Sequence, residues 1–355
     1  MWIKTLKIQQ FRNIEAATVE VPAGGAYAVV GPNGAGKTSL LEALSMLTPG
    51  RGLHRAKLEE ITRHNQPSWG VFARIRSGGE DHTLGMQFDR KKRQIKLDGQ
   101  PLTSAAPLAA LGSVVWFTPE MDRLFFDGPA PRRRFFDRLV FGLLPDHAEH
   151  LTRYTHHIQN RARLLKDSGD ADWIAIEEKQ AARWGVQVLA ARQTYLAALS
   201  PLLADVSLSL HGSAEKGESL PDEATFTTAL LDNRSRDKRF NSTHYGPHRT
   251  EVTGALTDTD AAISLTEASM GQHKRALMHI IIAHCRLIKD RTGQAPCLLL
   301  DEATAHLDQT NRARLFNQIQ SLGSQLWLTG TEENMFEGLE KVSFLRTEKG
   351  HFTWA

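Results

Sequence analysis

Two short segments near opposite ends of this 355-residue chain carry side chains suited to phosphate chemistry. Residues 31–38 read GPNGAGKT, and residues 301–302 are adjacent acids that follow the apolar run 297–300. Glycines let backbone amides approach phosphate oxygens, a lysine neutralises phosphate charge, and carboxylates bind Mg²⁺. Because one Mg-nucleotide site needs all of these groups, the sequence predicts that the two distant segments meet in the folded protein.

The residues of the glycine loop have separate expected roles. The predicted nucleotide-binding residues are Gly31, Pro32, Asn33, Gly34, Ala35, Gly36, Lys37 and Thr38. Lys37 is expected to contact the β- and γ-phosphates, and the Thr38 hydroxyl is expected to bind magnesium. The alternative interpretation is a glycine turn that simply precedes an ordinary helix.

The two acids are expected to have different roles, one in magnesium binding and one in hydrolysis. Asp301 would hold magnesium, directly or through water, and Glu302 would orient or deprotonate the attacking water. Lys37 and Glu302 are therefore the predicted catalytic residues. The alternative is a strand that ends in two solvated acids without a catalytic role.

Strands and helices must position these groups. Residues 26–30 read AYAVV, which predicts a buried strand that enters the glycine loop, and residues 39–48 have the apolar spacing of a following helix. Residues 297–300 have the pattern of a buried parallel strand whose carboxyl end carries function. The sequence therefore predicts an α/β fold.

A third candidate segment, ASMGQ at residues 268–272, precedes a long apolar pattern typical of a buried helix. Ser269 and Gly271 would lie at the helix start, where exposed amides favour anions, although an N-cap serine explains Ser269 equally well. In order with the glycine loop and the acids, this segment resembles the signature of the ATP-binding cassette superfamily. The resemblance implies that Ser269, Gly271 and Gln272 bind the γ-phosphate held by the opposite subunit, and that Asp308 belongs to a D-loop. It also implies a homodimer that ATP closes and hydrolysis releases.

Three longer strings resemble one family more specifically. They lie within residues 3–14, 114–139 and 243–252, and they contain FRN, RRRFFD and GPHR. They are similar to the RecF family of DNA gap-repair ATPases, and the similarity extends along the whole chain. The resemblance implies an ATP-dependent DNA-binding protein of recombinational repair and replication-fork recovery, which acts at gaps and junctions and hydrolyses ATP slowly. It further implies partnership with RecR and the RecO and RecA pathway, and a nucleotide contact from Arg12.

The resemblance divides the chain into a head and an insertion. The expected fold is an ABC-type P-loop ATPase head built from residues 1–115 and 255–355, with ATP and Mg²⁺ as cofactors. Residues 116–254 would form an inserted, mostly helical lobe without a long coiled coil.

Helical periodicity supports the inserted lobe. Apolar residues recur three and four positions apart over residues 145–166 and again over 173–195, which predicts two amphipathic helices. The polar turn at residues 167–172 would make them antiparallel neighbours. Trp173 and Trp184 fall on the apolar stripe and are expected to pack in the core.

Composition narrows the class of protein. The chain is 41% apolar and 23% charged, with 43 basic and 40 acidic residues, which is typical of a globular protein with little net charge. Its two cysteines, Cys285 and Cys297, lie in apolar stretches and predict buried thiols. The start lacks an apolar signal region and no stretch is long enough to span a bilayer, so we expect a cytoplasmic protein without a membrane partner.

Attraction to DNA must therefore come from local clusters of basic residues. Four clusters occur, at residues 90–93, 132–134, 161–166 and 234–239. In a dimer they would form a track for phosphates that is not specific for base sequence and weakens with salt. The first cluster also fits a solvated hairpin tip, and the second fits a loop held by carboxylates such as Asp127 and Asp137.

Two other classes of protein remain as alternatives. An ABC transporter subunit would power a membrane partner, but such subunits carry a histidine near the position of Thr329, and the RecF-like strings also argue against this class. A non-catalytic DNA clamp would have the same fold, with a Glu302 that activates no water.

Overall fold

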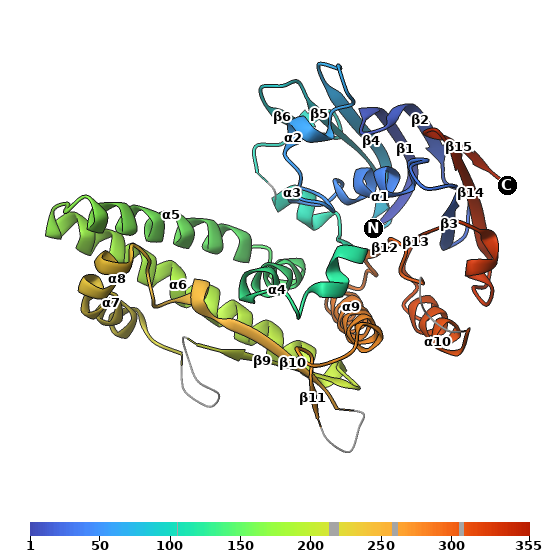
Figure 1. Ribbon diagram of the computed structural model, residues 1–355. Helices are drawn as coiled ribbons and strands as arrows, with labels where there is room; N and C mark the ends of the chain where they lie inside the picture. The colour runs from blue at the N-terminus through green and yellow to red at the C-terminus, as the bar shows by residue number, and fades with distance from the viewer. Residues whose placement is uncertain (105, 213–219, 258–261, 305–308) are drawn as a thin grey trace. The chain divides into compact units, whose positions relative to one another are not determined.

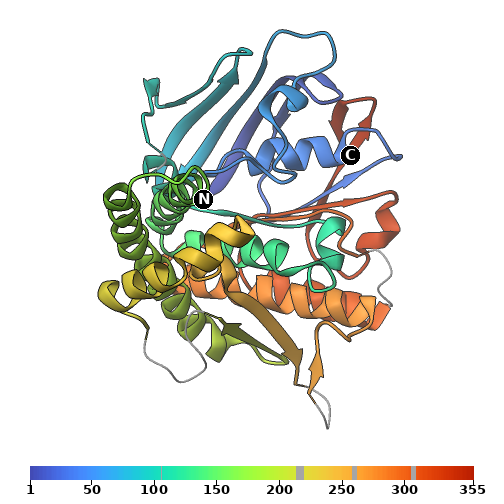
Figure 2. The same ribbon diagram turned by 60° about the vertical axis from the view of Figure 1, so that its left-hand side comes forward.

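The computed structural model describes residues 1–104, 106–212, 220–257, 262–304 and 309–355 (Figures 1 and 2). The chain divides into two compact units. Unit 1 comprises Met1–Asp122 and Ile280–Ala355, and unit 2 comprises Arg123–His279. Both units combine helices and strands, so the predicted α/β class is confirmed.

An antiparallel sheet forms one layer of unit 1, with the strand order β2-β1-β4-β5-β6-β7. The strands are β1 (Trp2–Phe11), β2 (Ile14–Glu20), β4 (Trp69–Ser77), β5 (Glu80–Phe88), β6 (Arg93–Leu97) and β7 (Gln100–Pro101). Along β4 every second residue is buried. This alternation arises because one face of the sheet packs on the core while the other faces solvent.

A second sheet of unit 1 has the order β15-β14-β3-β13-β12-β8. Its strands are β3 (Ala26–Val30), β8 (Val114–Phe117), β12 (Cys297–Leu300), β13 (Leu326–Gly330), β14 (Val342–Glu348) and β15 (His351–Trp354). All strand pairs except β14 with β15 are parallel. Strands β3, β12 and β13 are buried throughout, which confirms the two buried strands predicted at 26–30 and 297–300.

Helix α1 (Lys37–Ser45) connects the two sheets of unit 1. Its Leu40, Leu41 and Leu44 belong to one hydrophobic core together with residues from both sheets, such as Ile75 and Leu299. The other helical segments of this unit are α2 (Leu58–Ile61), α3 (Ala106–Ala110), η1 (Pro119–Arg123), α10 (Gln309–Gln320) and η4 (Glu333–Phe336). The core fixes the start of α1, and therefore the glycine loop, against the ends of the parallel strands.

Unit 2 is mostly helical. Its helical segments are α4 (Pro129–Leu143), α5 (His147–Lys166), α6 (Ala171–Leu199), η2 (Ser200–Leu202), α7 (Glu223–Asp232), α8 (Arg234–Phe240), η3 (Pro247–Arg249) and the first residues of α9 (Met270–Thr292). Its strands β9 (Val206–His211), β10 (Glu251–Leu256) and β11 (Ile263–Ser264) form a small antiparallel sheet. Helices α5 and α6 lie side by side, as predicted (Figures 1 and 2), and no long coiled coil occurs in the described ranges.

The limits of the compact units differ from the predicted domain boundaries at 115/116 and 254/255. The second predicted boundary would cut β10, whose residues pair with β9 from Glu251 to Leu256. Helix α9 is also continuous across the limit between His279 and Ile280. Strand pairing between distant segments is invisible in the sequence, so a boundary inferred from motif positions cannot detect it. The head and lobe remain a predicted division of the chain.

Two of the aromatic and apolar positions expected in the core of the helix pair lie elsewhere. Trp173 is 62% exposed and Ile176 is 51% exposed, so the prediction that Trp173 packs inside is wrong. Both belong to the first turns of α6, before that helix reaches the core formed around Ala181 and Phe226. Trp184 is partly buried against this core, as predicted.

A buried charge network holds the helices of unit 2 together. Arg161 has no exposed surface and donates to Glu178 at 2.9 Å and to Asp237 at 2.7 Å. It also donates to the Leu230 carbonyl at 2.6 Å. Four helices, α5 to α8, therefore meet at one guanidinium group.

Replacing Arg161 with alanine is expected to destabilise the protein by about 3–5 kcal/mol, because the buried carboxylates would lose their partner. Urea unfolding followed by circular dichroism measures this change. Arg163→Ala is the matched control, since Arg163 is exposed on the same helix and should cost less than about 0.5 kcal/mol. Equal destabilisation by the two variants would contradict a structural role for the network.

None of the helices in the described part of the chain is both long enough and apolar enough to cross a membrane.

Candidate nucleotide-binding site

The glycine loop follows β3 directly and ends at α1. Gly34 and Gly36 have φ angles of 78° and 111°, which lie in the left-handed region that favours glycine. Gly36 is the N-cap of α1. A Cβ at Gly31 would lie 2.3 Å from the Thr347 carbonyl oxygen, so only glycine fits there. The predicted order of strand, glycine loop and helix is therefore present.

Residues far away in the sequence support the loop. Asn13, in the turn between β1 and β2, donates to the Gly34 carbonyl at 2.8 Å and accepts from the Ser39 hydroxyl at 2.7 Å. The Ala35 carbonyl accepts from the Gly350 amide and the Thr347 hydroxyl, each at 2.9 Å. These contacts occupy the Gly34 and Ala35 carbonyls, and the backbone amides of such a loop can bind an anion.

Lys37 folds back over the glycine loop. Its Nζ donates to the Gly31 carbonyl at 2.8 Å and to the Pro32 carbonyl at 3.1 Å. Burial lowers the pKa of Lys37, and the negative charges of Glu302 and Asp301 oppose that shift. The ammonium group therefore lies within the electrostatic influence of both acids predicted from the sequence.

Asp301 lies at the carboxyl end of β12, as predicted, and is 4% exposed. Its carboxylate accepts from the Thr38 hydroxyl at 3.1 and 3.2 Å and from the Thr329 hydroxyl at 2.7 Å. Burial raises the pKa of Asp301, and the hydrogen bonds from Thr329 and Thr38 oppose that shift. The structure thus brings together the two residues that the sequence assigned to magnesium.

Glu302 begins a tight turn after the strand. Its φ angle of 48° is unusual for a residue other than glycine. Its backbone amide donates to the Thr329 hydroxyl at 2.9 Å, and its side chain is exposed. Thr329 therefore fixes both acids. The sequence draws attention to Thr329 only because transporter subunits carry a histidine near this position. Its contacts with the two acids are not predicted from the sequence.

The donor set fits magnesium. The Thr38 hydroxyl and the Asp301 carboxylate are oxygen ligands in mutual contact, and Mg²⁺ prefers one or two such protein ligands completed by phosphates and water. Among the described residues, no cluster of three or more His, Cys, Asp or Glu is suited to a metal.

Arg12 lies in the same turn as Asn13 and has a φ angle of 54°. Its guanidinium donates to both carboxylate oxygens of Glu42, at 2.7 and 2.9 Å, and to the Glu60 carbonyl at 2.9 Å. The hydrogen bond to Glu42 raises the pKa of Arg12, and burial opposes that shift. Its nearest partners are thus the glycine-loop helix and α2, and the nucleotide contact of Arg12 stays a prediction.

The signature segment lies in unit 2, at the start of α9. The Ser269 amide donates to the Gln272 side chain at 2.8 Å, and the Gln272 amide donates to the Ser269 hydroxyl at 3.3 Å. This reciprocal pair is a capping box, so the N-cap interpretation is correct for Ser269. Ser269 and Gly271 are also exposed, and a Cβ at Gly271 would meet no atom within 4 Å. Asp308 lies outside the described residues.

The two residues that follow the signature are buried in the packing of unit 2. His273 is fully buried, stacks on Phe126 with ring centroids 4.0 Å apart, and hydrogen-bonds the Leu265 carbonyl. Lys274 is buried beside it.

The cluster at 132–134 has a structural role. Arg132 is buried and donates to the Asp127 carbonyl at 2.8 Å and to the Glu251 carboxylate at 2.6 Å. Arg133 donates to the Thr250 carbonyl at 2.9 Å. The expectation that a carboxylate holds this loop is right in kind, but the carboxylate is that of Glu251. Asp127 accepts through its backbone carbonyl, and the Asp137 carboxylate is bound by Arg192 and His147.

Internal contacts also occupy parts of the other three basic clusters. Arg161 is in the core of unit 2, and Arg234 donates to Glu178 at 2.7 Å. Arg90 and Arg93 donate to backbone carbonyls at 3.1 and 2.7 Å from the hairpin between β5 and β6, the predicted tip. Arg161 is therefore withdrawn from the predicted DNA track.

Asn13→Ala is expected to weaken ATP binding by roughly tenfold, because the loop would lose two hydrogen bonds of about 1 kcal/mol each, with part of this recovered by water. Isothermal titration with ATP and magnesium measures the change. Ser39→Ala removes only one of the two bonds and should have the smaller effect. A larger effect from Ser39→Ala would show that Asn13 does not support the loop.

The family model that describes the RecF/RecN/SMC N terminal domain matches residues 2–353. The chain is 36% identical to the DNA replication and repair protein RecF of Rhizobium rhizogenes, over 99% of this chain and 98% of that protein. It is 35% identical to the RecF of Rhizobium meliloti, with the same coverage of each chain. These matches favour neither a transporter subunit nor a non-catalytic clamp.

Solved structures agree on the fold. The recombination mediator protein RecF in complex with ATP, from the RecFOR pathway, superimposes with a TM-score of 0.88 at 22% identity, covering 100% of this chain and 97% of that one. An Smc head bound to the C-winged helix domain of ScpA superimposes with a TM-score of 0.57 at 15% identity, with coverage of 100% and 97%. The chain therefore shares its fold with these RecF and Smc head structures. From the family model and the curated relatives together, the chain belongs to the RecF family of DNA replication and repair proteins.

Proposed function

We propose that this protein is an ATP-controlled DNA-binding homodimer that acts in recombinational repair. The observation that carries the proposal is the contact between the Thr38 hydroxyl and the Asp301 carboxylate, at 3.1 and 3.2 Å. These residues come from opposite ends of the chain, and they supply the two oxygen ligands that a Mg-nucleotide requires beside a glycine loop.

ATP would bind with its phosphates along residues 31–38. Lys37 would exchange its two carbonyl partners for β- and γ-phosphate oxygens, which satisfy an ammonium group better because they are charged. The N-terminus of α1 would add its dipole to the same pocket. Magnesium, held by Thr38 and Asp301, would neutralise the charge of the phosphates.

Hydrolysis would use Glu302 to orient or deprotonate a water molecule. The exposed side chain is available to water, while Thr329 holds its backbone. The signature residues Ser269, Gly271 and Gln272 of a second copy would bind the γ-phosphate, and Asp308 would lie at the same interface. The exposure of Ser269 and Gly271 supports this assignment, because residues that act on another copy must be accessible. We expect a weak ATPase activity that DNA stimulates, because hydrolysis would control when the protein is released from DNA.

DNA would bind to the ATP-closed dimer at gaps and at junctions of single-stranded and duplex DNA, without base specificity. The full-length similarity to RecF proteins supports RecR, RecO and RecA as members of the same pathway. Arg12, which binds Glu42 of the glycine-loop helix, would contact the nucleotide.

Sizing the protein by light scattering, with and without ATP, magnesium and a gapped duplex, tests the proposal. A dimer is expected only when ATP is present, and the gapped duplex should increase its fraction. A molar mass that never changes with ATP would exclude nucleotide control of assembly.

A further inference from the structure

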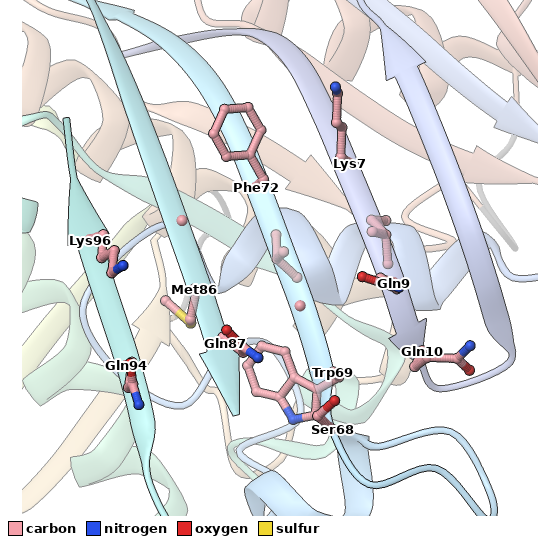
Figure 3. A pocket seen from close by; sticks show the side chains of 14 residues that line it. Lys7, Gln9, Gln10, Ser68, Trp69, Phe72, Met86, Gln87, Gln94 and Lys96 are labelled. Atoms are coloured by element: carbon pink, nitrogen blue, oxygen red, sulfur yellow. The ribbon is translucent and has the colours of Figure 1, made fainter. Parts of the chain in front are cut away.

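The solvent-exposed face of the antiparallel sheet of unit 1 carries a hollow of about 470 Å³ (Figure 3). It spans β1, β4, β5 and β6, and none of the basic clusters visible in the sequence contributes to it. Among its lining residues are Lys7, Gln9, Phe72, Gln87, Gln94 and Lys96.

Strand register places four of the lining residues in one row across the sheet. Lys7 is opposite Phe72, Phe72 is opposite Gly85, and Gly85 is opposite Lys96. Neighbouring strands are about 4.8 Å apart, so the two lysines are separated by three strand spacings, or roughly 14 Å. An aromatic ring and an empty glycine position thus lie between two positive charges.

A second row of the hollow runs parallel to the first. It consists of Gln9, Gly70, Gln87 and Gln94, again paired across the four strands. Three amide side chains that can both donate and accept hydrogen bonds therefore lie beside the row that contains Phe72. Gly70 keeps the floor between them low.

The space beside Phe72 is open. A Cβ built at Gly85 would meet no atom within 4 Å. Phe72 is half-buried, and the Lys7 ammonium lies 6.0 Å from its ring centroid. A planar group stacked on Phe72 would thus lie close to the Lys7 ammonium.

The charge of this face is positive and largely unneutralised. Within the part of the chain that the structure describes, neither Lys7 nor Lys96 forms an ion pair with an acidic side chain. Acids at the ends of the neighbouring strands have other partners, since Glu20 pairs with Arg74 at 3.6 Å and Asp98, directly after β6, pairs with His82 at 2.8 Å. Among these described residues, an anionic ligand therefore meets two ammonium groups that no carboxylate neutralises.

We infer that this sheet face binds a short stretch of single-stranded nucleic acid, with a base stacked on Phe72 and phosphates at Lys7 and Lys96. Stacking on an aromatic side chain beside backbone-neutralising cations is how proteins bind single strands without reading their sequence. A duplex fits the hollow less well, because its bases are stacked on each other and cannot cover Phe72. The choice of a nucleic acid over an acidic protein segment rests on the proposed DNA-related function.

Fluorescence anisotropy with a labelled oligothymidylate and the full-length protein, without nucleotide, tests this inference. Phe72→Leu keeps apolar bulk but removes the aromatic face, and it is expected to weaken binding by roughly 5- to 150-fold. Phe72→Tyr should retain the affinity. Gly85→Val should weaken binding by filling the open space, and it suits a strand.

Charge and position are tested separately. The double variant Lys7→Glu/Lys96→Glu should reduce the slope of log affinity against log salt by about 0.7 for each phosphate that is no longer neutralised. Lys341→Glu changes an exposed lysine outside this face and is the matched control, with no expected change. An oligonucleotide carrying 5-iodouracil should photo-cross-link to Phe72, which mass spectrometry of the peptides would reveal.

Two outcomes would overturn the inference. One is an unchanged affinity of Phe72→Leu together with equal competition by polyglutamate, which would make the face a site for acidic protein segments. The other is an equal effect of Lys341→Glu and the double variant. Failure here is distinguishable from failure of the proposed function, because Phe72→Leu and Gly85→Val should still dimerise with ATP, and Lys37→Ala should still bind the oligonucleotide.

Discussion

Lys37→Ala is expected to abolish the ATP-promoted retention of DNA by this protein. The variant loses a charged donor to the β- and γ-phosphates, and hydrogen bonds to charged groups contribute about 1.5–3 kcal/mol. ATP affinity should therefore fall by roughly 10- to 150-fold. Filter retention of a gapped duplex at increasing ATP measures the linked effect on DNA.

Folding should survive this substitution. In the structure Lys37 contacts two loop carbonyls, and these can turn to water when the side chain is removed. Lys341→Ala removes a positive charge from the surface of unit 1 and is the control for overall charge. Undiminished retention of DNA by Lys37→Ala, with circular dichroism unchanged, would refute control by the nucleotide.

Glu302→Gln is expected to slow hydrolysis by about 10²–10⁴-fold, because an amide cannot accept a proton from water in the transition state. ATP binding should persist, since the Thr38 and Asp301 ligands are untouched. The variant should therefore accumulate as an ATP-bound dimer on DNA. Phosphate release and light scattering measure the two effects on the same sample.

The hydrolysis rate and the oligomeric state of Glu302→Gln test two separate predictions. Hydrolysis at the wild-type rate would mean that Glu302 activates no water, which is the behaviour of a structural clamp. A Glu302→Gln protein that stays monomeric with ATP, and whose DNA affinity does not change, would exclude nucleotide-driven dimerisation. Thr329→Val is a useful companion, because it removes the hydroxyl that holds Asp301 and the Glu302 backbone without altering either carboxylate.

The distribution of arginines bears on where DNA binds. Arg161 and Arg132 are buried, although both belong to clusters that look like exposed positive patches in the sequence. In contrast, Lys7 and Lys96 are far apart in the sequence, and strand pairing brings them to the same hollow on one face of the sheet. A search for DNA contacts guided by runs of basic residues would therefore mutate structural arginines and miss the sheet face.

Those parts of the fold and the site that depend on local patterns could be predicted from the amino-acid sequence. A glycine loop between a buried strand and a helix requires neighbouring residues only, so the order of strand, loop and helix follows from the sequence, although the helix spans Lys37–Ser45 and not residues 39–48. The acids after β12 and the helix pair α5 and α6 are likewise encoded in short apolar periods. The resemblance to the RecF family rests on three strings within residues 3–14, 114–139 and 243–252, which need no coordinates to be recognised.

The distant residues that complete the site and the core could be identified from the folded chain but not from sequence patterns. Asn13 and Thr329 hold the glycine loop and the acids through hydrogen bonds between residues far apart in the chain. Whether a charged or aromatic residue is buried depends on what packs against it, which is why Arg161 lies inside while Trp173 lies outside. Such contacts form between segments that no local period relates, and so burial, pairing register and the hollow around Phe72 appear only when the chain is folded.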